Sequence, residues 1–284
     1  MTKIRDSIVL VTGGASGIGK LMGQGCLQRA ARKLVIWDVN ASALQQVTQQ
    51  LQADGHSVWG CVVDVSKPEE VEEAARQVMH QVGVPHILFN NAGIVVGKPF
   101  AEHTYQDIQR TLDINVLGAM AVARAFLPAM LARGSGHIVN IASAAGLLPN
   151  PRMSVYAASK WAVLGWSESL RLELEALRQD LHVTTVTPSY IDTGMFARVK
   201  APFLTPILKP ETISKSILDA VEQNKILLRR PALVHLLPLL RGILPTRLFD
   251  SLVGRGFNVY TSMDRFAGRP AAEAVPGKPT TTNV

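Results

Sequence analysis

Two residues that could share a proton stand four positions apart in the middle of the chain, Tyr156 and Lys160. Residues with this spacing lie on one face of a helix. A free phenol has a pKa of about 10 and is a poor base at neutral pH, but a nearby cation favours its phenolate form. We therefore expect Lys160 to lower the pKa of Tyr156 toward the range in which acid–base catalysis is efficient.

Other polar residues end or interrupt apolar segments in a way that suggests one shared site. Ser143 ends an apolar run thirteen residues before Tyr156, and Asn90-Asn91-Ala92-Gly93 follows another such run. Asn115 lies within the apolar helical pattern of Asp107–Ala132, where a polar residue needs a reason. Because the carboxyl ends of strands line the ligand crevice of a doubly wound sheet, the hydroxyl of Ser143 could hydrogen-bond a substrate oxygen.

A glycine-rich loop near the N-terminus has the features of a dinucleotide-binding turn. Gly13-Gly14-Ala15-Ser16-Gly17-Ile18-Gly19 follows the apolar run Ser7–Thr12 and precedes a helical pattern. Glycine permits a tight turn and a close approach of the backbone to a pyrophosphate, and the free N–H groups of a helix N-terminus favour an anion. The pattern also requires an acid about 20 residues further on, and Asp38 occupies that position.

Asp38 also bears on the choice of cofactor. A carboxylate there can accept hydrogen bonds from the ribose hydroxyls of NAD, and it would repel the 2′-phosphate of NADP. Neither Ser16 nor Val39 is basic, which favours NAD over NADP. Arg32 and Lys33, at the start of the same apolar run, leave NADP as the alternative.

Asp64 follows the third apolar run, Ser57–Val63, and allows two interpretations. Its carboxylate could hydrogen-bond the adenine amino group of the cofactor. It could instead cap the N-terminus of a helix that begins near Ser66-Lys67-Pro68-Glu69. The sequence leaves both interpretations open.

These residues need a scaffold that brings the ends of several strands together. Short apolar runs alternate with helix-length segments such as Ala41–Ala53, Pro68–Val82 and Tyr105–Met130. Runs that are apolar throughout suit strands buried on both faces of a parallel sheet, and parallel strands need crossovers of this length. The pattern therefore predicts a doubly wound α/β fold. The predicted strands are Ser7–Thr12, Lys33–Asp38, Ser57–Val63, His86–Asn90, Gly136–Ala142 and Leu181–Thr187, with Lys225–Arg230 as a further candidate.

Length and composition exclude several other classes of protein. The 284 residues are 47% hydrophobic, which suffices for a core and excludes wholesale disorder. Two cysteines, Cys26 and Cys61, cannot form a disulfide scaffold or complete a zinc site alone, so we expect a reduced, intracellular protein. The seven histidines show no metal-ligand spacing. We predict no signal peptide, and no membrane-spanning helix, because no uninterrupted apolar run approaches about 18 residues.

Together these motifs resemble one family. Thr12-Gly13-x-x-x-Gly17-Ile18-Gly19, Asn90-Asn91-Ala92-Gly93, Asn115, Ser143 and Tyr156-x-x-x-Lys160 are similar in order and spacing to the motifs of the classical short-chain dehydrogenases/reductases, over roughly residues 5–230. The resemblance implies a Rossmann-like sheet of seven parallel strands flanked by helices, with NAD(P) bound across it. It also implies a homodimer or homotetramer, formed through long helices around residues 105–132 and 156–178.

The resemblance further implies a role for each motif. Tyr156 would be the acid/base that takes the proton of an alcohol while a hydride passes to the cofactor. Lys160 would lower the pKa of Tyr156 and hold the nicotinamide ribose, Ser143 would hold the substrate oxygen, and Asn115 would take part in a water-linked proton relay. The family usually has Pro-Gly where this chain has Pro188-Ser189, which puts the local backbone path in question. The implied cofactor contacts are Gly13, Ala15, Ser16, Gly17, Ile18, Gly19, Asp38, Asp64, Val65, Asn91, Ala92, Gly93, Tyr156, Lys160, Pro188, Ile191 and Thr193.

We expect residues 1–268 to form a single NAD(P)-binding domain. Within it, residues 194–268 would supply a variable substrate lid and C-terminal helices, and Gly194–Pro210 reads as a loop. Residues 269–284 are rich in Pro, Thr and Ala and are predicted to be a disordered tail.

The stretch from Lys225 to Gly256 is both basic and apolar. It holds six basic residues and a single acidic one, Asp250, and it is rich in leucine between Ala232 and Pro245. It could form helices that pack on the domain or on a partner subunit. It could instead lie in a membrane interface, with its arginines on anionic lipid. Nucleic-acid binding is not expected, because no aromatic residues are interleaved with the charges.

The C-terminal part is similar to a narrower branch of the family. Leu244-Pro245-Thr246 and Ser262-Met263-Asp264-x-Phe266-x-Gly268-Arg269 resemble the retinol dehydrogenases and 17β-hydroxysteroid dehydrogenase-like enzymes, which implies a lipophilic alcohol or carbonyl as substrate. Many members carry an N-terminal membrane anchor, which is not seen here, so we expect a soluble or bacterial relative that is cytoplasmic and that could contact a membrane peripherally. The expected apolar substrate pocket consists of Leu147, Leu148, Met153, Tyr190, Met195, Phe196 and Phe203.

The expected function is thus the NAD-dependent interconversion of a lipophilic alcohol and its carbonyl, without a metal. One alternative is an NADPH-dependent carbonyl reductase, which Asp38 argues against. Another is an NAD(P)-binding sensor without catalysis. The sensor is disfavoured because Tyr156, Lys160, Ser143 and Asn115 are all present.

Overall fold

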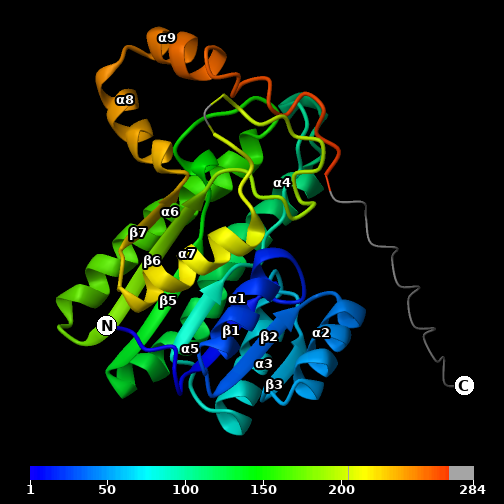
Figure 1. Ribbon diagram of the computed structural model, residues 1–284, viewed down its shortest axis with the longest axis vertical. Helices are drawn as coiled ribbons and strands as arrows, with labels where there is room; N and C mark the ends of the chain where they lie inside the picture. Colours follow the sequence, from blue (N-terminus) through cyan, green and yellow to red (C-terminus); the bar gives the residue numbers. More distant parts are fainter. Residues whose placement is uncertain (204, 269–284) are drawn as a thin grey trace, which may run out of the picture.

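The computed structural model describes residues 1–203 and 205–268, so the tail predicted at 269–284 lies outside the described residues. Its strands are β1 (Ile8–Thr12), β2 (Lys33–Asp38), β3 (Val58–Val62), β4 (Ile87–Asn90), β5 (Ser135–Ile141), β6 (Asp180–Pro188) and β7 (Leu227–Arg230). They form one parallel sheet in the order β3-β2-β1-β4-β5-β6-β7 (Figure 1). This confirms the predicted doubly wound fold, and each strand boundary lies within about two residues of its predicted position.

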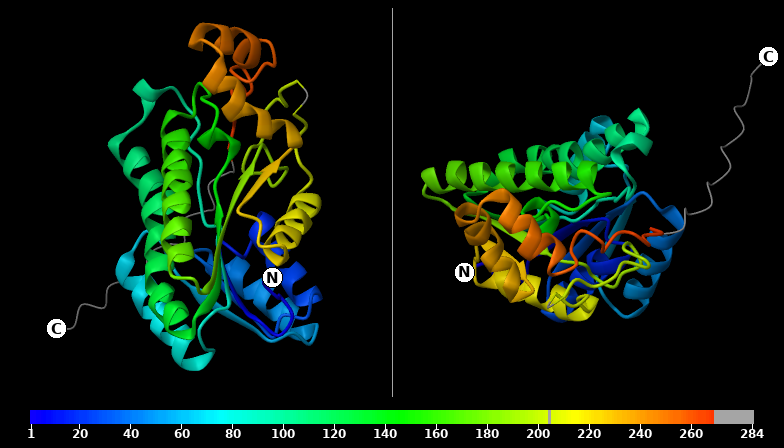
Figure 2. Two further views of the ribbon diagram at one scale, coloured as in Figure 1. Left: turned by 90° about the vertical axis from the view of Figure 1, so that its left-hand side faces the viewer. Right: turned by 90° about the horizontal axis from the view of Figure 1, so that it is seen from above.

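Helices cover both faces of the sheet, which explains why its central strands are apolar on both sides. Every residue of β1 and β4 is buried. Figure 2 shows the helical layers on either side of the sheet. One face is covered by α1 (Gly17–Gln28), α2 (Ala41–Ala53) and α7 (Pro210–Glu222), and the other by α3 (Pro68–Gln81), α5 (Ala119–Arg133) and α6 (Ser154–Ala176).

Local sequence signals set where several helices begin. Asn40 caps α2, and its side chain accepts a hydrogen bond from the N–H of Ala43 at 3.0 Å. Thr104 and Asp107 form a capping box at the start of α4 (Tyr105–Leu112). Pro68 is the first residue of α3, where its fixed φ suits the helix. Its missing N–H costs no hydrogen bond there, because the first N–H groups of a helix have no acceptor within the helix.

The helix predicted over Tyr105–Met130 extends to Arg133 and contains a π-helical turn, η2 (Asp113–Gly118), between α4 and α5. The apolar periodicity did not predict this turn, which carries Asn115. By length and composition the stretch Tyr105–Arg133 could cross a membrane. The stretch passes this test although no uninterrupted apolar run in it approaches about 18 residues, because average hydropathy tolerates isolated charges. Phe126 and Met130 are fully buried against the sheet, which is the packing of a core helix.

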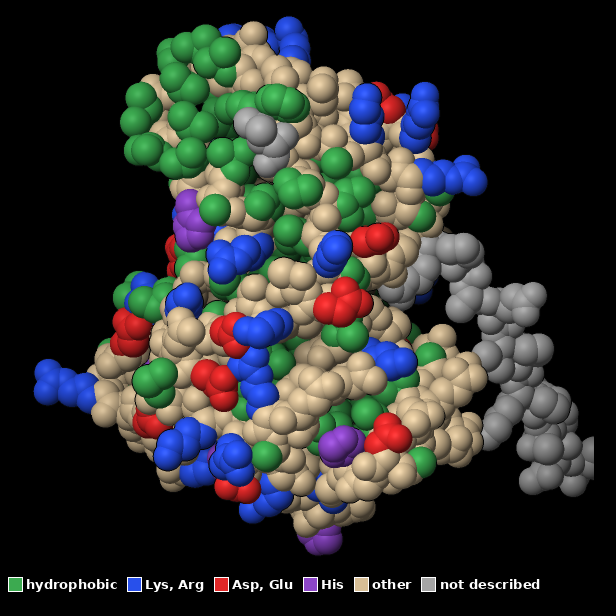
Figure 3. All heavy atoms as spheres, in the orientation of Figure 1, with side chains coloured by type: hydrophobic (Ala, Val, Ile, Leu, Met, Phe, Trp, Pro, Cys, Tyr) green, Lys and Arg blue, Asp and Glu red, His purple; other side chains and the backbone are tan. Residues whose placement is uncertain are grey.

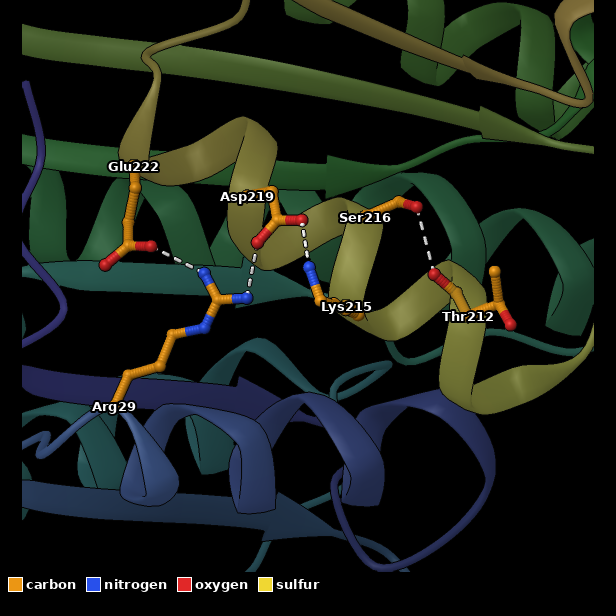
Figure 4. Close-up of polar contacts among 6 residues, drawn as sticks. All are labelled: Arg29, Thr212, Lys215, Ser216, Asp219 and Glu222. Carbon is orange, nitrogen blue, oxygen red and sulfur yellow. Dashed lines mark hydrogen bonds and ion pairs between the residues drawn. The ribbon is translucent and has the colours of Figure 1, made fainter.

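Ion pairs join the end of α1 to α7, a helix that the sequence analysis did not predict. The guanidinium of Arg29 contacts Asp219 at 2.6 Å and Glu222 at 2.5 Å, and Lys215 contacts Asp219 at 2.8 Å (Figure 4). Partly exposed pairs of this kind contribute at most about 1 kcal/mol each. Burial of side chains such as Leu218 in the core shared by the two helices is therefore the larger stabilising contribution.

The two cysteines are free thiols, as the sequence analysis expected. Cys26 is buried, and burial raises its pKa to about 12, while Cys61 is half-buried. Within residues 1–203 and 205–268, no group of three or more His, Cys, Asp or Glu side chains could hold a metal ion.

After β7 the chain forms an extension beyond the carboxyl ends of the strands (orange in Figure 1). A polar contact ties its last part back to the sheet: the hydroxyl of Ser262 lies 2.8 Å from the hydroxyl of Tyr190 and 3.0 Å from the side-chain amide of Asn150. The extension has its own small core of Val234, Leu237, Phe249 and Val253. Its elements are η4 (Ala232–Leu236), α8 (Leu237–Ile243), α9 (Thr246–Phe249) and η5 (Asp250–Arg255).

Candidate active site

The residues predicted from the motifs gather at the carboxyl edge of the sheet, beside β1 and β4, where the strand order reverses. They surround a cleft of about 260 Å³. Ala15 and Asn115 lie outside its wall. The predicted residues that line the cleft are Gly13, Ser16, Gly17, Ile18, Gly19, Asp38, Asp64, Val65, Asn91, Ala92, Gly93, Ser143, Tyr156, Lys160, Pro188, Ile191 and Thr193.

The glycine loop has no space for side chains. Gly13 and Gly17 have φ values of +64° and +54°, in the left-handed region that favours glycine. A Cβ on Gly13 would lie 3.0 Å from the Cα of Ala92, and one on Gly19 would clash with the carbonyl oxygen of Gly13. The side chain of Asn91 donates to the carbonyl of Gly13 at 3.1 Å and holds the turn in place. This bare turn before the N-terminus of α1 fits a pyrophosphate bound by backbone N–H groups.

Asp38, the last residue of β2, lines the cleft. Its Oδ2 accepts a hydrogen bond from the N–H of Ala15 and its Oδ1 accepts one from the N–H of Asn40, both at 3.0 Å. Each carboxylate oxygen has two acceptor positions, so both oxygens can still accept hydrogen bonds from hydroxyl groups. Ala15 therefore supports Asp38 from outside the cleft, although it was predicted as a direct cofactor contact.

Asp64 lines the cleft but does not cap α3. Its Oδ1 accepts hydrogen bonds from the N–H of Ser66 at 3.0 Å and from its hydroxyl at 2.6 Å, in a turn before the helix. The residue at the N-cap position is Lys67. The capping interpretation is therefore wrong, and contact with the adenine stays a prediction.

Tyr156, in α6, is only 5% exposed, and the ring of Phe196 lies edge-on to it at 6.1 Å. Burial raises the pKa of Tyr156 to about 12, although a hydrogen bond with Ser143 acts in the opposite direction. The expected lowering of this pKa by Lys160 is not found. The ammonium lies 5.7 Å from the centre of the phenol ring, and desolvation of the phenolate dominates.

Lys160 is buried one turn further along α6. Its Nζ donates a hydrogen bond to the carbonyl of Ile141 at 2.8 Å, which anchors the side chain to the end of β5. Burial lowers the pKa of Lys160 to about 8. The side chain is therefore still mainly protonated at neutral pH, but it loses its proton more readily than an exposed lysine does.

Asn115 lies behind these residues, in the π-helical turn. Its Oδ1 accepts from the N–H of Ile94 at 2.8 Å, and its Nδ2 donates to the carbonyl of Ile94 at 3.0 Å and to the hydroxyl of Ser159 at 3.0 Å. The amide thus joins the loop after β4 to the helix that carries Tyr156 and Lys160. These hydrogen bonds satisfy the buried side-chain amide of Asn115. Its part in a proton relay stays a prediction.

A second cavity, of about 230 Å³, adjoins the cleft and shares Ser143, Ser189 and Phe196 with it. We call this cavity the chamber. Met195, which was predicted for the substrate pocket, lines the cleft instead, and Leu147 packs against neighbouring core side chains. The other predicted pocket residues line the chamber: Leu148, Met153, Tyr190, Phe196 and Phe203.

Sequence reasoning missed most of the wall that the extension contributes. The leucine-rich composition of 232–245 was noticed, but the inward-facing side chains depend on how the short helices fold back over the sheet. In the cleft, Arg110, Ile94 and Ile114 were also missed, because no motif includes them. The missed chamber residues of the extension are Leu233, Val234, Leu236, Leu237, Leu240, Val253, Phe257 and Val259.

Comparison with known proteins identifies the family. The family model for short chain dehydrogenases matches residues 7–202, from the start of the sheet to the loop after β6. The chain belongs to this family. It is 37% identical over 270 residues to epidermal retinol dehydrogenase 2 of Mus musculus, which covers 94% of this chain and 87% of that protein. It is 34% identical over 253 residues to estradiol 17-beta-dehydrogenase 11 of Rattus norvegicus, which covers 89% and 84%.

Solved structures of short-chain dehydrogenases have the same architecture. A short-chain dehydrogenase/reductase from Burkholderia phymatum in complex with NAD is 26% identical, with a TM-score of 0.76 over 90% of this chain and 97% of that chain. A metagenomic short-chain oxidoreductase in complex with NADP is also 26% identical, with a TM-score of 0.68 over 80% and 98%. Family members thus bind either dinucleotide.

As a short-chain dehydrogenase, the chain is an NAD(P)-dependent oxidoreductase acting on the CH–OH group of alcohols, and its relatives confirm the retinol and 17β-hydroxysteroid dehydrogenase-like branch. Ser189, which stands where the family usually has glycine, does not disturb the backbone. Its N–H donates to the carbonyl of Arg230 at 2.8 Å and extends the hydrogen bonding between β6 and β7.

Proposed function

We propose that this short-chain dehydrogenase oxidises a lipophilic alcohol, of the retinol, steroid or long-chain type, with NAD as the hydride acceptor, and catalyses the reverse reduction. The observation that carries the proposal is the chamber. Its wall is almost entirely apolar, and it joins the cleft at Ser143, next to Tyr156. An apolar cavity with a few polar groups at one end favours a ligand that is apolar except at its reacting group.

Asp38 supports NAD as the cofactor. Its carboxylate is fixed at the cleft by two backbone N–H groups and can accept hydrogen bonds from two ribose hydroxyls. This negative charge would repel the 2′-phosphate of NADP. Lys33 begins β2 and Asp38 ends it, so the basic pair Arg32 and Lys33 lies at the opposite end of the strand. These observations favour NAD, so an NADPH-dependent carbonyl reductase is the second candidate function.

The proposed mechanism assigns the proton to Tyr156 and the oxygen to Ser143. NAD, when bound, supplies the hydride acceptor. The hydroxyl of Ser143, fixed by the N–H of Ala145 at 3.1 Å, would hold the substrate oxygen. The phenolate oxygen of Tyr156 would take the proton of the alcohol. Because burial raises the pKa of Tyr156 to about 12, the phenolate is scarce at neutral pH, and we expect oxidation to accelerate as the pH rises.

Lys160 and Asn115 support this proton transfer. The ammonium of Lys160 would bind the ribose next to the nicotinamide. Because burial lowers its pKa to about 8, Lys160 in its neutral form would take up the proton that Tyr156 gains in the oxidation and pass it to solvent, and it would return a proton to Tyr156 in the reduction. Asn115 would act as a positioning residue, since its side-chain oxygen and nitrogen form hydrogen bonds with backbone and side-chain groups around Lys160.

The proposed assembly is a homodimer or homotetramer formed through the helices of residues 105–133 and α6. The exposed side chains of Leu117, Trp161 and Leu172 on these helices support it. A stable interface would bury such apolar side chains.

The proposal is tested with two conservative variants, assayed with NAD and either retinol or estradiol. Tyr156→Phe removes the proposed acid/base, and we expect kcat to fall by about 10³-fold. Tyr190→Phe is the matched control, because this partly buried tyrosine lines the chamber and is not itself part of the cleft wall, and we expect its kcat to stay within about threefold. Undiminished turnover by Tyr156→Phe, or no turnover of either alcohol by the wild type, would contradict the proposal.

A further inference from the structure

The extension presents large apolar side chains to solvent. Leu239 and Ile243 on α8 are 57% and 68% exposed, and Leu252 in η5 is 51% exposed. Leu236, Leu239 and Ile243 stand at i, i+3 and i+7, the spacing of one helix face. Figure 3 shows that hydrophobic side chains gather over α8 and α9 in a continuous patch, which is larger than scattered surface leucines would give. We call Leu236, Leu239, Ile243, Leu248 and Leu252 the apolar face.

The length of the helical segment restricts how it could meet lipid. Ala232–Ile243 is apolar but only 12 residues long by its bounds. A helix needs about 20 apolar residues to cross a bilayer, and shorter amphipathic segments lie in the interface instead. The polar side of this segment is attached to the protein: the guanidinium of Arg241 lies 4.7 Å from the ring of Trp161 and donates to the carbonyl of Leu147 at 3.1 Å. The segment can therefore bury its apolar face without leaving the domain.

The charges around the apolar face have one sign. Arg241, Arg247 and Arg255 are all exposed beside it. The one acidic residue of the stretch, Asp250, is partly buried and accepts a hydrogen bond from the hydroxyl of Tyr260 at 2.6 Å. Basic residues next to an interfacial helix are attracted to an anionic membrane surface. The charge therefore favours a bilayer with anionic headgroups.

The chamber reaches the surface at the same face. Leu236 and Phe203 both line the chamber, yet they are 47% and 60% exposed. We propose that the apolar face docks on an anionic lipid bilayer, so that the mouth of the chamber opens toward the lipid and a lipophilic substrate enters from the membrane. The docking itself is independent of the proposed function, which it uses only for the class of substrate that enters.

Binding to vesicles tests the docking without any turnover. The full-length protein is sedimented with vesicles of phosphatidylcholine alone and with vesicles that contain one part of phosphatidylglycerol to three of phosphatidylcholine. We expect binding to the anionic vesicles, and a fall of at least about tenfold in the partition coefficient for the double variant Leu239→Gln/Ile243→Gln. Arg247→Gln/Arg255→Gln should weaken binding to the anionic vesicles alone, and added salt should weaken it likewise.

The matched control is Leu177→Gln/Ile226→Gln. These side chains are 50% and 51% exposed, just beyond the end of α6 and just before β7 rather than on the extension, so this variant should bind vesicles like the wild type. None of the three double variants alters a residue that lines the cleft or the chamber, so turnover of a water-soluble alcohol should be unchanged in all of them. Absence of alcohol turnover in the wild type would count against the proposed function and leave the docking measurement valid.

Three results would overturn the docking. The first is wild-type protein that stays in solution with both kinds of vesicle. The second is equal binding by wild type and Leu239→Gln/Ile243→Gln. The third is a change of oligomeric state in that variant with no change in vesicle binding, which would identify the apolar face as a contact between copies of the chain.

Discussion

The cleft at the sheet edge and the chamber under the extension share three residues, but they are built in different ways. Strand ends and tight turns form the cleft, and polar contacts fix them: Asn91 holds Gly13, and Asp38 holds Ala15. Apolar side chains on short helices form much of the chamber, and the contact at Ser262 is one of the polar contacts that tie the extension to the rest of the domain. The cleft therefore holds individual hydrogen-bond donors and acceptors in fixed positions. The chamber determines only how large and how apolar its ligand can be.

This difference separates two kinds of effect. Substitutions in the cleft should change the chemistry or the cofactor for every substrate. Substitutions in the chamber should change which alcohol is accepted and leave the chemistry alone.

After the loss of kcat by about 10³-fold expected for Tyr156→Phe, the largest effect is expected at Gly19. In Gly19→Ala the new Cβ would meet the carbonyl oxygen of Gly13 and the side chain of Asn91, so the turn must shift. Overpacking of this kind costs about 1–3 kcal/mol, and we expect the Kd for NAD to rise by up to about 100-fold in calorimetric titration. Gly165→Ala on α6 is the control, because a Cβ there meets nothing within 4 Å. Unchanged affinity in Gly19→Ala would show that the cleft is as adaptable as the chamber.

Asp38→Asn should change the choice of cofactor. It removes the charge and keeps one side-chain acceptor, so kcat/KM with NAD should fall about 10- to 100-fold, as for lost hydrogen bonds to a charged group. The value with NADP should rise, because the repulsion of the 2′-phosphate is gone. Asp64→Asn alters the other carboxylate of the cleft and should leave the NAD-to-NADP ratio as it was. If both variants shift this ratio equally, Asp38 does not select the cofactor.

Acid should destabilise the framework beneath the cleft through His137 in β5. This imidazole is fully buried, with its two nitrogens 2.8 Å from the hydroxyls of Thr2 and Thr184. Burial lowers its pKa from 6.5 to about 3; the charge of His182 acts in the same direction and that of Asp180 opposes it. The neutral form therefore stabilises the fold above about pH 6.5, and this contribution is lost as the pH falls.

Between pH 7 and pH 5 the loss from this one group is about 2 kcal/mol of unfolding free energy. Urea unfolding at the two pH values measures it. The variant His137→Gln should show a pH dependence smaller by about that amount, whereas His80→Gln, which alters an exposed histidine, should behave like the wild type. Equal pH dependence in all three proteins would rule out His137 as the origin of the acid sensitivity.

The smallest effect is expected in the chamber, where neighbouring leucines provide a matched pair. Leu240 lines the chamber, whereas Leu239 points to solvent. For substrates delivered without lipid, Leu240→Gln should lower kcat/KM about tenfold for retinol or a steroid alcohol and leave a short alcohol unaffected. Leu239→Gln should change neither. A similar loss for short and long alcohols in Leu240→Gln would mean that the chamber also positions the reacting groups.

The same contrast explains what could be predicted from sequence. The cleft follows from local signals, because glycines, strand ends and the pair Tyr156 and Lys160 occur at short, regular spacings. The chamber depends on how residues 194–268 fold back, and α7 in particular starts at Pro210, in a segment whose prolines suggested a loop. The raised pKa of Tyr156 was also not predictable, because burial is a property of the assembled site rather than of the motif.

In the proposed mechanism a cleft for NAD and a chamber for an apolar alcohol meet at Ser143, beside Tyr156. The most direct test is kcat/KM, measured with NAD and with NADP, for alcohols of increasing apolar size from isopropanol through a long-chain secondary alcohol to retinol and estradiol. We expect larger values with NAD at every size and a rise with apolar area. Faster turnover with NADP, or a preference for the short alcohols, would contradict it.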